Sequence, residues 1–373
     1  MNKPGLNRPI QLGLVGNLEN RRIRDFCARW LALGQPAPTL IDYQQLPNAA
    51  PHVDVLRIDS PGENAALAAY LIALGGAPKA ANIEHGEVAY LREFHLGYCE
   101  LLRRIEAWEL PAFNAPGEIA VMFDKWQSHQ RFLGAGPSVA MSDTLEISLA
   151  TSDTREVTRP PSTLAPTSYA EWQKQRADHG RVFLKPLHGS SSSGVCALRW
   201  TPTRQQLKSP IRIVGGRLFN SLRVQSYETW EEIEFILARL LPHGMIAETW
   251  IPKLSLEGGA VDVRILVIAG KARHYVVRQS HSPMTNLHLG NRRANPSGLE
   301  APLAAASRLA EKAAACFPNS LYAGVDVLLD RRGQPYIGEI NAFGDLLPGL
   351  IDCGEDPYTA IGNAYLCRVS LSA

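Results

Sequence analysis

The chain has 373 residues, with 38 lysines and arginines against 36 aspartates and glutamates, and a net charge of +2 at pH 7. This length allows two to three domains, and the charge balance lacks the basic excess of a dedicated nucleic-acid-binding protein, so we expect no nucleic-acid partner. Charged residues at 20% and hydrophobic residues at 45% exclude a disordered or fibrous protein.

The cysteines and the apolar segments bear on location. Six cysteines are scattered without a Cys-x-x-Cys pair, a pattern that indicates a reducing compartment and supports neither a disulfide framework nor a zinc knuckle. No stretch approaches the ~20 apolar residues of a membrane span, and the N-terminus lacks the cleavage site of a signal peptide. We therefore expect a cytoplasmic protein with no membrane partner.

The first part of the chain alternates between strand-like and helix-like segments. Residues 10–16 (IQLGLVG) predict a strand, residues 19–34 an amphipathic helix and residues 63–74 a second helix, with strand-like pieces between them. The apolar stripe of the first helix comprises Ile23, Phe26, Cys27, Trp30 and Leu31. This alternation predicts a small α/β domain over residues 1–117.

The segment RIDSPGEN (57–64) offers Arg57, Ser60 and Glu63 at the end of a strand. It is interpreted either as a polar pocket facing the rest of the protein or as a helix cap formed by Ser60 with an acid in the first turn. Residues 142–168 are rich in Ser, Thr and Pro and predict a connection with one short strand. Downstream, hairpins with short helices between them predict an antiparallel α+β unit.

A loop of glycines and serines follows the strand-like segment that ends at Lys185. The loop comprises Gly189, Ser190, Ser191, Ser192, Ser193 and Gly194, and a second strand begins at Val195. Small residues let backbone N–H groups and hydroxyls approach anionic oxygens closely, and Lys185 supplies a positive charge for the same anion. The loop is therefore a candidate phosphate site. A serine-rich hairpin tip on a plain surface is the alternative.

Charged residues interrupt the apolar strands predicted between residues 245 and 279. Glu248 lies inside the first strand, and Asp262, Arg264 and Arg278 lie in a hairpin with an Ala-Gly-Lys turn. A two-residue turn would put Asp262 and Arg278 on opposite faces, whereas a three-residue turn would pair them. The sequence leaves both turns open, and a structural salt bridge is the alternative role for each arginine.

Two acidic residues face each other in a hairpin predicted near the C-terminus, formed by LYAGVDVLLD (321–330) and PYIGEI (335–340). If Asp330 pairs with Pro335, then Asp326 lies opposite Glu339, and Asn341 shares their face. Adjacent carboxylates repel each other unless a cation lies between them, and this all-oxygen trio suits Mg²⁺. A solvated strand face is the alternative.

Taken together, these segments resemble the ATP-grasp superfamily, in particular the branch of glutathione synthetases and ribosomal-protein glutamate ligases. The resemblance covers residues 120–350 and rests on FDKW (123–126), FLKPLHGSSSSGV (183–195), AETW (247–250) with DVRILVIAGK (262–271), VVRQ (276–279) with TNLHLG (285–290), and AGVDVLL (323–329) with GEIN (338–341). His188 departs from the family pattern, because smaller residues are common before the glycine loop.

The resemblance implies a nucleotide site made of several segments. Lys125 and Lys185 look like the two lysines that hold the phosphates of ATP, under a loop running from Gly189 to Gly194. Glu248, with the backbone of Thr249, Trp250 and Ile251, looks like the adenine-binding hinge. Asp262 is similar to the acid that takes the ribose hydroxyls.

The resemblance also implies the metal ligands and the catalytic groups. Asp326, Glu339 and Asn341 match the ligands of Mg²⁺. Arg278 and Asn286 look like the pair that grips the transferred phosphoryl group, with Lys185 as the third catalytic residue.

The fold that the resemblance implies is α/β and α+β, with a small α/β domain (1–117) before two α+β lobes (118–245 and 246–373) that hold ATP. The implied activity is ligation of a small-molecule or peptide carboxylate to an amine through an acyl-phosphate, with release of ADP and phosphate. The implied cofactors are ATP and Mg²⁺, as two ions that Mn²⁺ can replace, and family analogy suggests a homodimer. Two alternatives stay open: an ATP-grasp phosphotransferase and a non-catalytic nucleotide-binding module.

Overall fold

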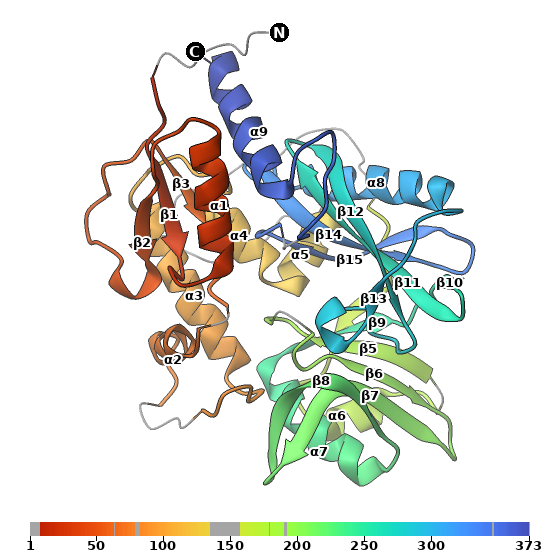
Figure 1. The fold of residues 1–373 in the computed structure, drawn as a ribbon. Coiled ribbons are helices and arrows are strands. Elements are labelled where there is room, and N and C mark those ends of the chain that lie inside the picture. Colours follow the sequence, from red (N-terminus) through yellow and green to blue (C-terminus); the bar gives the residue numbers. More distant parts are fainter. Residues whose placement is uncertain are drawn as a thin grey trace.

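Three sheets organise the described part of the chain (Figure 1). The computed structural model describes residues 8–62, 64–78, 83–134, 157–178, 180–189, 192–344 and 347–372. The first sheet is parallel and the other two are antiparallel. The α/β and α+β fold class expected from the sequence is therefore confirmed.

The first sheet forms the core of an N-terminal α/β domain. Its strands β1 (Leu12–Gly16), β2 (Thr39–Asp42) and β3 (Val55–Ile58) lie in the order β2-β1-β3. Around it lie α1 (Arg21–Ala32), η1 (Tyr43–Gln45), α2 (Ala65–Leu74) and α3 (Leu91–Glu106). Ile23, Phe26 and Trp30 of the predicted stripe are buried, but Leu31 is 50% exposed because it lies off the buried face of α1.

The second sheet has a hydrophobic core of its own. Its order is β4-β9-β5-β6-β7-β8, with strands β4 (Ser162–Leu164), β5 (Gly180–Pro186), β6 (Cys196–Trp200), β7 (Gln205–Val214), β8 (Arg217–Tyr227) and β9 (Met245–Thr249). Helices α6 (Tyr169–Gln175) and α7 (Trp230–Leu240), followed by η2 (Leu241–His243), contribute Trp172 and Ile236 to this core. Strand β9 extends this sheet to Thr249.

The third sheet carries most of the charged residues that the sequence singled out. Its path is β13-β12-β11-β14-β15, with β10 paired to β11. The strands are β10 (Ser255–Leu256), β11 (Gly259–Ile268), β12 (Lys271–Ser280), β13 (Arg292–Arg293), β14 (Tyr322–Leu329) and β15 (Pro335–Asn341). Its helices are η3 (Leu287–Leu289), α8 (Glu300–Ala314) and α9 (Pro357–Ser372).

The N-terminal domain packs directly against the third sheet. Helices α4 (Pro116–Met122) and α5 (Lys125–Phe132) follow α3, and α4 shares a core with α8 and β14. The Asn114 side chain donates hydrogen bonds to the carbonyl oxygens of Tyr322, at 2.9 Å, and Ala342, at 2.7 Å. Helix α9 packs beside α1 (Figure 1). Within the described residues, no helix is both long and apolar enough to cross a bilayer.

A β-bulge decides the pairing of Asp262 and Arg278. The turn between β11 and β12 has two residues, Ala269 and Gly270, with φ of 48° and 76°, because Ile268 pairs with Lys271. A two-residue turn alone would separate the two charged residues, but β12 carries an extra residue further along and Asp262 pairs with Arg278. The pairing that the sequence assigned to a three-residue turn therefore arises from a shorter turn and a bulge.

A second bulge sets the pairing of Asp326 and Glu339. The expected pairing of Asp330 with Pro335 is wrong, because Leu329 pairs with Pro335. The extra residue Gly338 in β15 shifts the register, so that Asp326 does lie opposite Glu339. The expected face-to-face placement of the two acids is therefore confirmed by a different route.

We expect Gly97→Ala to destabilise the protein, because helices α2 and α3 cross with their backbones in contact. A Cβ atom on Gly97 would lie 2.0 Å from the carbonyl oxygen of Leu71. Overpacking of this kind lowers the free energy of unfolding by about 1–3 kcal/mol, which urea denaturation measures. The control is Gly117→Ala in α4, where the added Cβ meets only the Glu106 side chain at 3.4 Å. Equal losses in the two variants would contradict the prediction.

Candidate functional site

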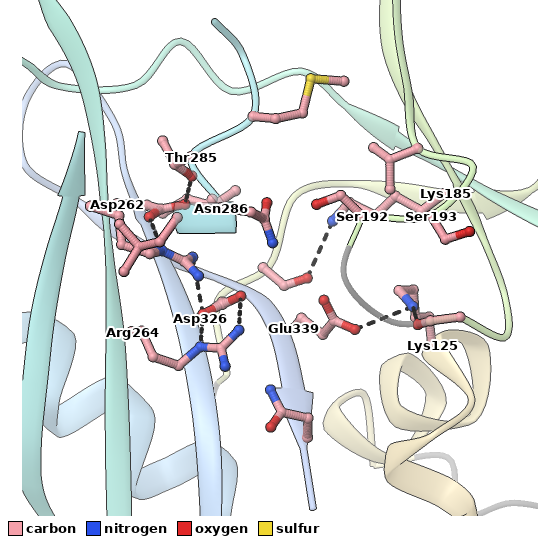
Figure 2. A pocket seen from close by; sticks show the side chains of 18 of the residues that line it. Lys125, Lys185, Ser192, Ser193, Asp262, Arg264, Thr285, Asn286, Asp326 and Glu339 are labelled. Carbon is pink, nitrogen blue, oxygen red and sulfur yellow. Dashed lines mark hydrogen bonds and ion pairs between the residues drawn. The ribbon is translucent and has the colours of Figure 1, made fainter. Parts of the chain in front are cut away.

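A cavity of about 510 Å³ is lined by residues from the N-terminal domain and from both antiparallel sheets. Figure 2 shows Lys125 and Glu339 on one side of it and Asp262, Arg264 and Asp326 on the other. The expected site residues in its wall are Lys125, Lys185, Gly189, Ser192, Ser193, Glu248, Thr249, Ile251, Asp262, Arg278, Asn286, Asp326, Glu339 and Asn341. Gly194 and Trp250, although described, do not line it, and Ser190 and Ser191 lie outside the described residues.

Lys125 connects the glycine loop to the third sheet. It opens α5, whose first turn is capped by the Asp124 side chain, with Oδ1 accepting from the backbone N–H groups of Trp126 and Gln127. The Lys125 ammonium donates to the carbonyl oxygen of Gly189 at 2.9 Å and lies 3.2 Å from Oε1 of Glu339. The cap therefore fixes the start of the helix from which this lysine reaches the cavity.

Lys185 is held by a buried acid that a second cation also contacts. Its Nζ lies 2.5 Å from Oε2 of Glu248, and Nη2 of Arg159 lies 3.2 Å from Oε1 of the same carboxylate. Glu248 is only 2% exposed. The Glu248 carboxylate therefore forms ion pairs with two cations. Of the other residues of the expected hinge, Thr249 and Ile251 line the cavity.

The glycine loop needs its two flanking glycines. Gly189 has φ of 155° and Gly194 has φ of 69°, backbone conformations that other residues rarely adopt. A Cβ atom on Gly194 would also lie 2.8 Å from the side chain of Pro186. Between them, Ser192 has φ of 60°, and both Ser192 and Ser193 face the cavity. The described part of the loop therefore brings small polar groups to the cavity, as expected.

Asp262 is surrounded by donors. Its Oδ1 accepts from Nε of Arg278 at 2.8 Å, and its Oδ2 lies 3.2 Å from Nζ of Lys253 and accepts from the Thr285 hydroxyl. Burial acts to raise the pKa of Asp262, but Arg278 and Lys253 hold it well below the usual range. Burial lowers the pKa of the Lys253 ammonium, against the pull of Asp262. The ribose-binding role expected of Asp262 stays a prediction.

Asp326 is paired with two arginines. Arg264 contacts both carboxylate oxygens, with Nη2 at 2.8 Å from Oδ2, and Nη2 of Arg278 lies 3.0 Å from Oδ1. Although burial acts to raise the pKa of Asp326, the two guanidinium groups lower it. The sequence left each arginine open to a structural salt bridge, and the structure shows that Arg264 and Arg278 both form one.

The three expected metal ligands lie together, and a glycine on the neighbouring strand leaves space for the Asn341 side chain. Asp326 faces Glu339, and Asn341 pairs with Gly324, where a Cβ atom would lie 2.9 Å from the Asn341 side-chain oxygen. Two carboxylates and an amide oxygen are the hard donors that Mg²⁺ prefers. The donor set therefore fits the ion, with Arg264 and Lys125 balancing the carboxylates in the structure described.

The cavity wall carries an excess of positive charge. Among the described residues that line it, six are basic, namely Arg22, Lys125, Lys185, Lys253, Arg264 and Arg278, and four are acidic, namely Glu248, Asp262, Asp326 and Glu339. Buried or partly buried charges of one sign attract ligands of the other sign. This wall suits an anionic ligand.

The N-terminal domain contributes one end of the cavity. Asn20, Arg22, Ser60 and Gly62 line it. Ser60 is not the cap of α2, because the Asn64 side chain accepts from the N–H of Leu67 at that position. Arg57 is fully buried and pairs with Asp59 at 3.1 Å, so of the two described residues singled out in this segment only Ser60 reaches the cavity.

Two residues of this site were not predicted from the sequence. Arg159 and Lys253 contact expected site residues, but no local pattern marked them, because each acts on a partner in another element. Thr285, which contacts Asp262, lies in the TNLHLG segment but was assigned no role. Lys253 lies four residues after Thr249, the last residue of the strand that contains Glu248. A lysine shortly after an apolar strand is the sequence signal that could have identified it.

Comparison with known proteins found similar structures but no similar sequences. Neither a family model nor a curated protein matched the chain. The D-cycloserine synthetase DcsG is 13% identical, with a TM-score of 0.58 over 96% of this chain and 99% of that one. A RimK-domain ATP-grasp protein from Sphaerobacter thermophilus is 14% identical, with a TM-score of 0.52 over 95% and 99%. The ATP-grasp ligase PsnB, complexed with a precursor variant, Mg and ADP, is 14% identical, with a TM-score of 0.50 over 97% and 100%.

We expect Asp326→Asn to destabilise the protein at neutral pH and by a smaller amount in acid. Removing one partner of a buried ion pair costs about 3–5 kcal/mol. Because the pKa of Asp326 is lowered in the folded state, its contribution is present above the unfolded pKa of about 3.9 and is lost as the pH falls further.

Urea denaturation of both proteins at about pH 7 and about pH 3 measures this difference, which should shrink in acid. Glu257→Gln is the control, because the Glu257 side chain is 82% exposed and its pair with Arg292 lies on the surface. A cost of Asp326→Asn that is the same at both pH values would contradict the prediction.

Proposed function

We propose that this chain, which has the ATP-grasp fold, is an ATP-dependent ligase that joins a carboxylate to an amine and releases ADP and phosphate. One observation carries the proposal. Lys125 and Lys185 lie in the same cavity as the facing carboxylates of Asp326 and Glu339. Cations for phosphate oxygens and hard oxygen donors for Mg²⁺ are the two requirements of phosphoryl transfer.

The proposed chemistry proceeds in two displacements. A substrate carboxylate is a poor acyl donor, because its leaving group would be oxide. Its oxygen attacks the γ-phosphorus of ATP, the bond to the β-phosphate oxygen breaks, and ADP leaves. The amine then attacks the carbonyl carbon of the acyl-phosphate, the C–O bond to phosphate breaks, and the amine loses its proton to solvent.

The residues of this chain would bind and orient the reacting groups. Lys125 and Lys185 would hold phosphate oxygens beneath the glycine loop, and Arg278 with Asn286 would hold the transferred phosphoryl group. Mg²⁺ bound to Asp326, Glu339 and Asn341 would neutralise charge on the phosphates.

The adenine would lie against the end of β9 and the chain that follows it. Thr249 and Ile251 line the cavity there, and Phe183 forms its neighbouring wall. Glu248 would act through Lys185 rather than on the base, because its carboxylate lies 2.5 Å from the Lys185 ammonium. Asp262 would accept hydrogen bonds from the ribose hydroxyls in place of one of its present donors, which are Arg278, Lys253 and Thr285.

The similar structures support ligation over simple phosphoryl transfer. They are named as a synthetase and as a ligase, and the ligase was complexed with a variant of its minimal precursor, Mg and ADP. We therefore include in the proposal a small-molecule or peptide carboxylate as substrate, and two Mg²⁺ ions that Mn²⁺ can replace. The proposal also includes a cytoplasmic location and a homodimer. It divides the chain into a domain 1–117 followed by lobes 118–245 and 246–373.

Release of ADP and phosphate tests the proposal. The protein is incubated with ATP, Mg²⁺ and pooled amino acids and short peptides, and the products are identified by mass spectrometry. We expect ADP, phosphate and an amide in equal amounts. Glu339→Gln should lower the rate by about 10²–10³-fold, the cost of removing one group that stabilises charge in the transition state.

Glu228→Gln is the matched control, because Glu228 is an exposed residue directly after β8 and its side chain accepts from Gln206. It should leave the rate unchanged. ADP with a phosphorylated product and no free phosphate would identify a phosphotransferase instead. Nucleotide binding without turnover would identify a non-catalytic module.

A further inference from the structure

A second cluster of potential metal ligands lies beside the cavity. It comprises His95 and Cys99 on α3, Asp124 at the cap of α5, and His188 after β5. In the described part of the chain none of the four lines the cavity. The cluster is independent of the proposed ligase activity, and His188 is the residue that departs from the family pattern.

Donor atoms of His95, Asp124 and His188 lie close enough together for one metal ion, and Cys99 contacts His95. Nε2 of His188 lies 2.9 Å from Oδ2 of Asp124, and Nε2 of His95 lies 3.4 Å from Sγ of Cys99. One ligand atom each from His95, Asp124 and His188 all lie within 4.8 Å of one another. Ligand atoms around a tetrahedral Zn²⁺ are roughly 3.3 to 3.6 Å apart, given Zn–N and Zn–S bonds of about 2.0 and 2.3 Å.

The cluster is buried and its imidazoles have few other partners. His95 is 5% exposed, and the His188 side chain is 11% exposed. The two rings stack, with centroids 3.8 Å apart. Nδ1 of His188 is buried without a hydrogen-bond partner. Buried polar atoms without partners are uncommon and call for an explanation.

The protonation of these groups favours ligand behaviour. Burial and the neighbouring His188 lower the pKa of His95 to about 3, so its imidazole is neutral at pH 7. Burial acts to raise the pKa of Asp124, but the hydrogen bond with His188 lowers it to about 2, so it is a carboxylate. Burial raises the pKa of the Cys99 thiol to about 11, so a metal must displace its proton.

We propose that His95, Cys99, Asp124 and His188 form a binding site for a borderline-soft divalent cation, with Zn²⁺ as its probe. Two imidazoles, one thiolate and one carboxylate form a donor set that Zn²⁺ binds, whereas Mg²⁺ prefers oxygen ligands. The Zn–S bond forms as the Cys99 proton leaves to solvent, and no oxidant or reductant is needed.

Binding requires a rearrangement of the stacked rings. An imidazole binds a metal through a lone pair in its ring plane, so His95 and His188 must turn out of their stack. Among the described residues, the hydrogen bonds of the His95 side chain are with Cys99, through both ring nitrogens. Asp124 keeps Oδ1 on the N–H groups of α5 and offers Oδ2 to the metal.

The site would join three segments that meet at the phosphate end of the cavity. It lies on α3 of the N-terminal domain, next to Lys125 at the start of α5 and next to Gly189 at the start of the glycine loop. Lys125 already donates to the carbonyl oxygen of Gly189 at 2.9 Å. A bound ion would therefore fix the relative positions of the lysine and the loop.

Metal content and the spectrum of a cobalt derivative test this proposal. The full chain is loaded with Zn²⁺ in an excess of Mg²⁺, dialysed and analysed by mass spectrometry for metals; we expect one Zn²⁺ per chain. Co²⁺ in its place should give a thiolate charge-transfer band in the near ultraviolet. Cys99→Ser should abolish that band and release the zinc more readily, and His95→Gln should lose the zinc.

Cys353→Ser is the matched control, because Cys353 is an exposed cysteine away from the cluster. It should keep both the zinc and the band. If His95→Gln fails to fold, Cys99→Ser decides the result, since it changes a single atom. A chain that retains no Zn²⁺, or an unchanged cobalt band in Cys99→Ser, would overturn the proposal and leave the stacked histidines as a packing element.

Discussion

The site depends on carboxylates that are buried in a β-sheet and must be balanced there by cations. Asp262 and Asp326 lie on neighbouring strands, β11 and β14, and both are nearly inaccessible to water. Burying an ionised carboxylate is costly unless a cation is paired with it. Arg278 contacts both acids, and Arg264 contacts Asp326. This network of ion pairs links strands β11, β12 and β14 beside the cavity.

The sequence predicted the faces of these strands better than their turns. The hairpin registers considered from the sequence placed Asp326 opposite Glu339 and offered the pairing of Asp262 with Arg278, and both pairs occur. The turns were assigned incorrectly or left open, since each hairpin contains a bulge. A bulge inserts a residue without changing the local pattern of polar and apolar residues. Both pairs therefore occur because a bulge shifts the register within each hairpin, which loop length alone does not predict.

Contacts between distant elements were beyond the sequence. Arg159 lies far from Glu248 along the chain, and the two meet because β4 pairs with β9. The same is true of His95 and Asp124, which the packing of α3 beside His188 brings together. Each residue alone has an ordinary interpretation, as a surface charge or a core histidine. Their roles appear only once the sheets and helices are assembled.

The central claim is that this cavity binds ATP with Mg²⁺ between its lysines and its carboxylates. Calorimetric titration with a non-hydrolysable ATP analogue tests this claim most directly, with and without Mg²⁺, on the unaltered chain and on Lys185→Met. The account predicts binding of one nucleotide per chain, weakened at least about tenfold without Mg²⁺ or without the Lys185 ammonium, a loss of about 1.4 kcal/mol. Absence of binding, or equal affinity in all four titrations, would contradict it.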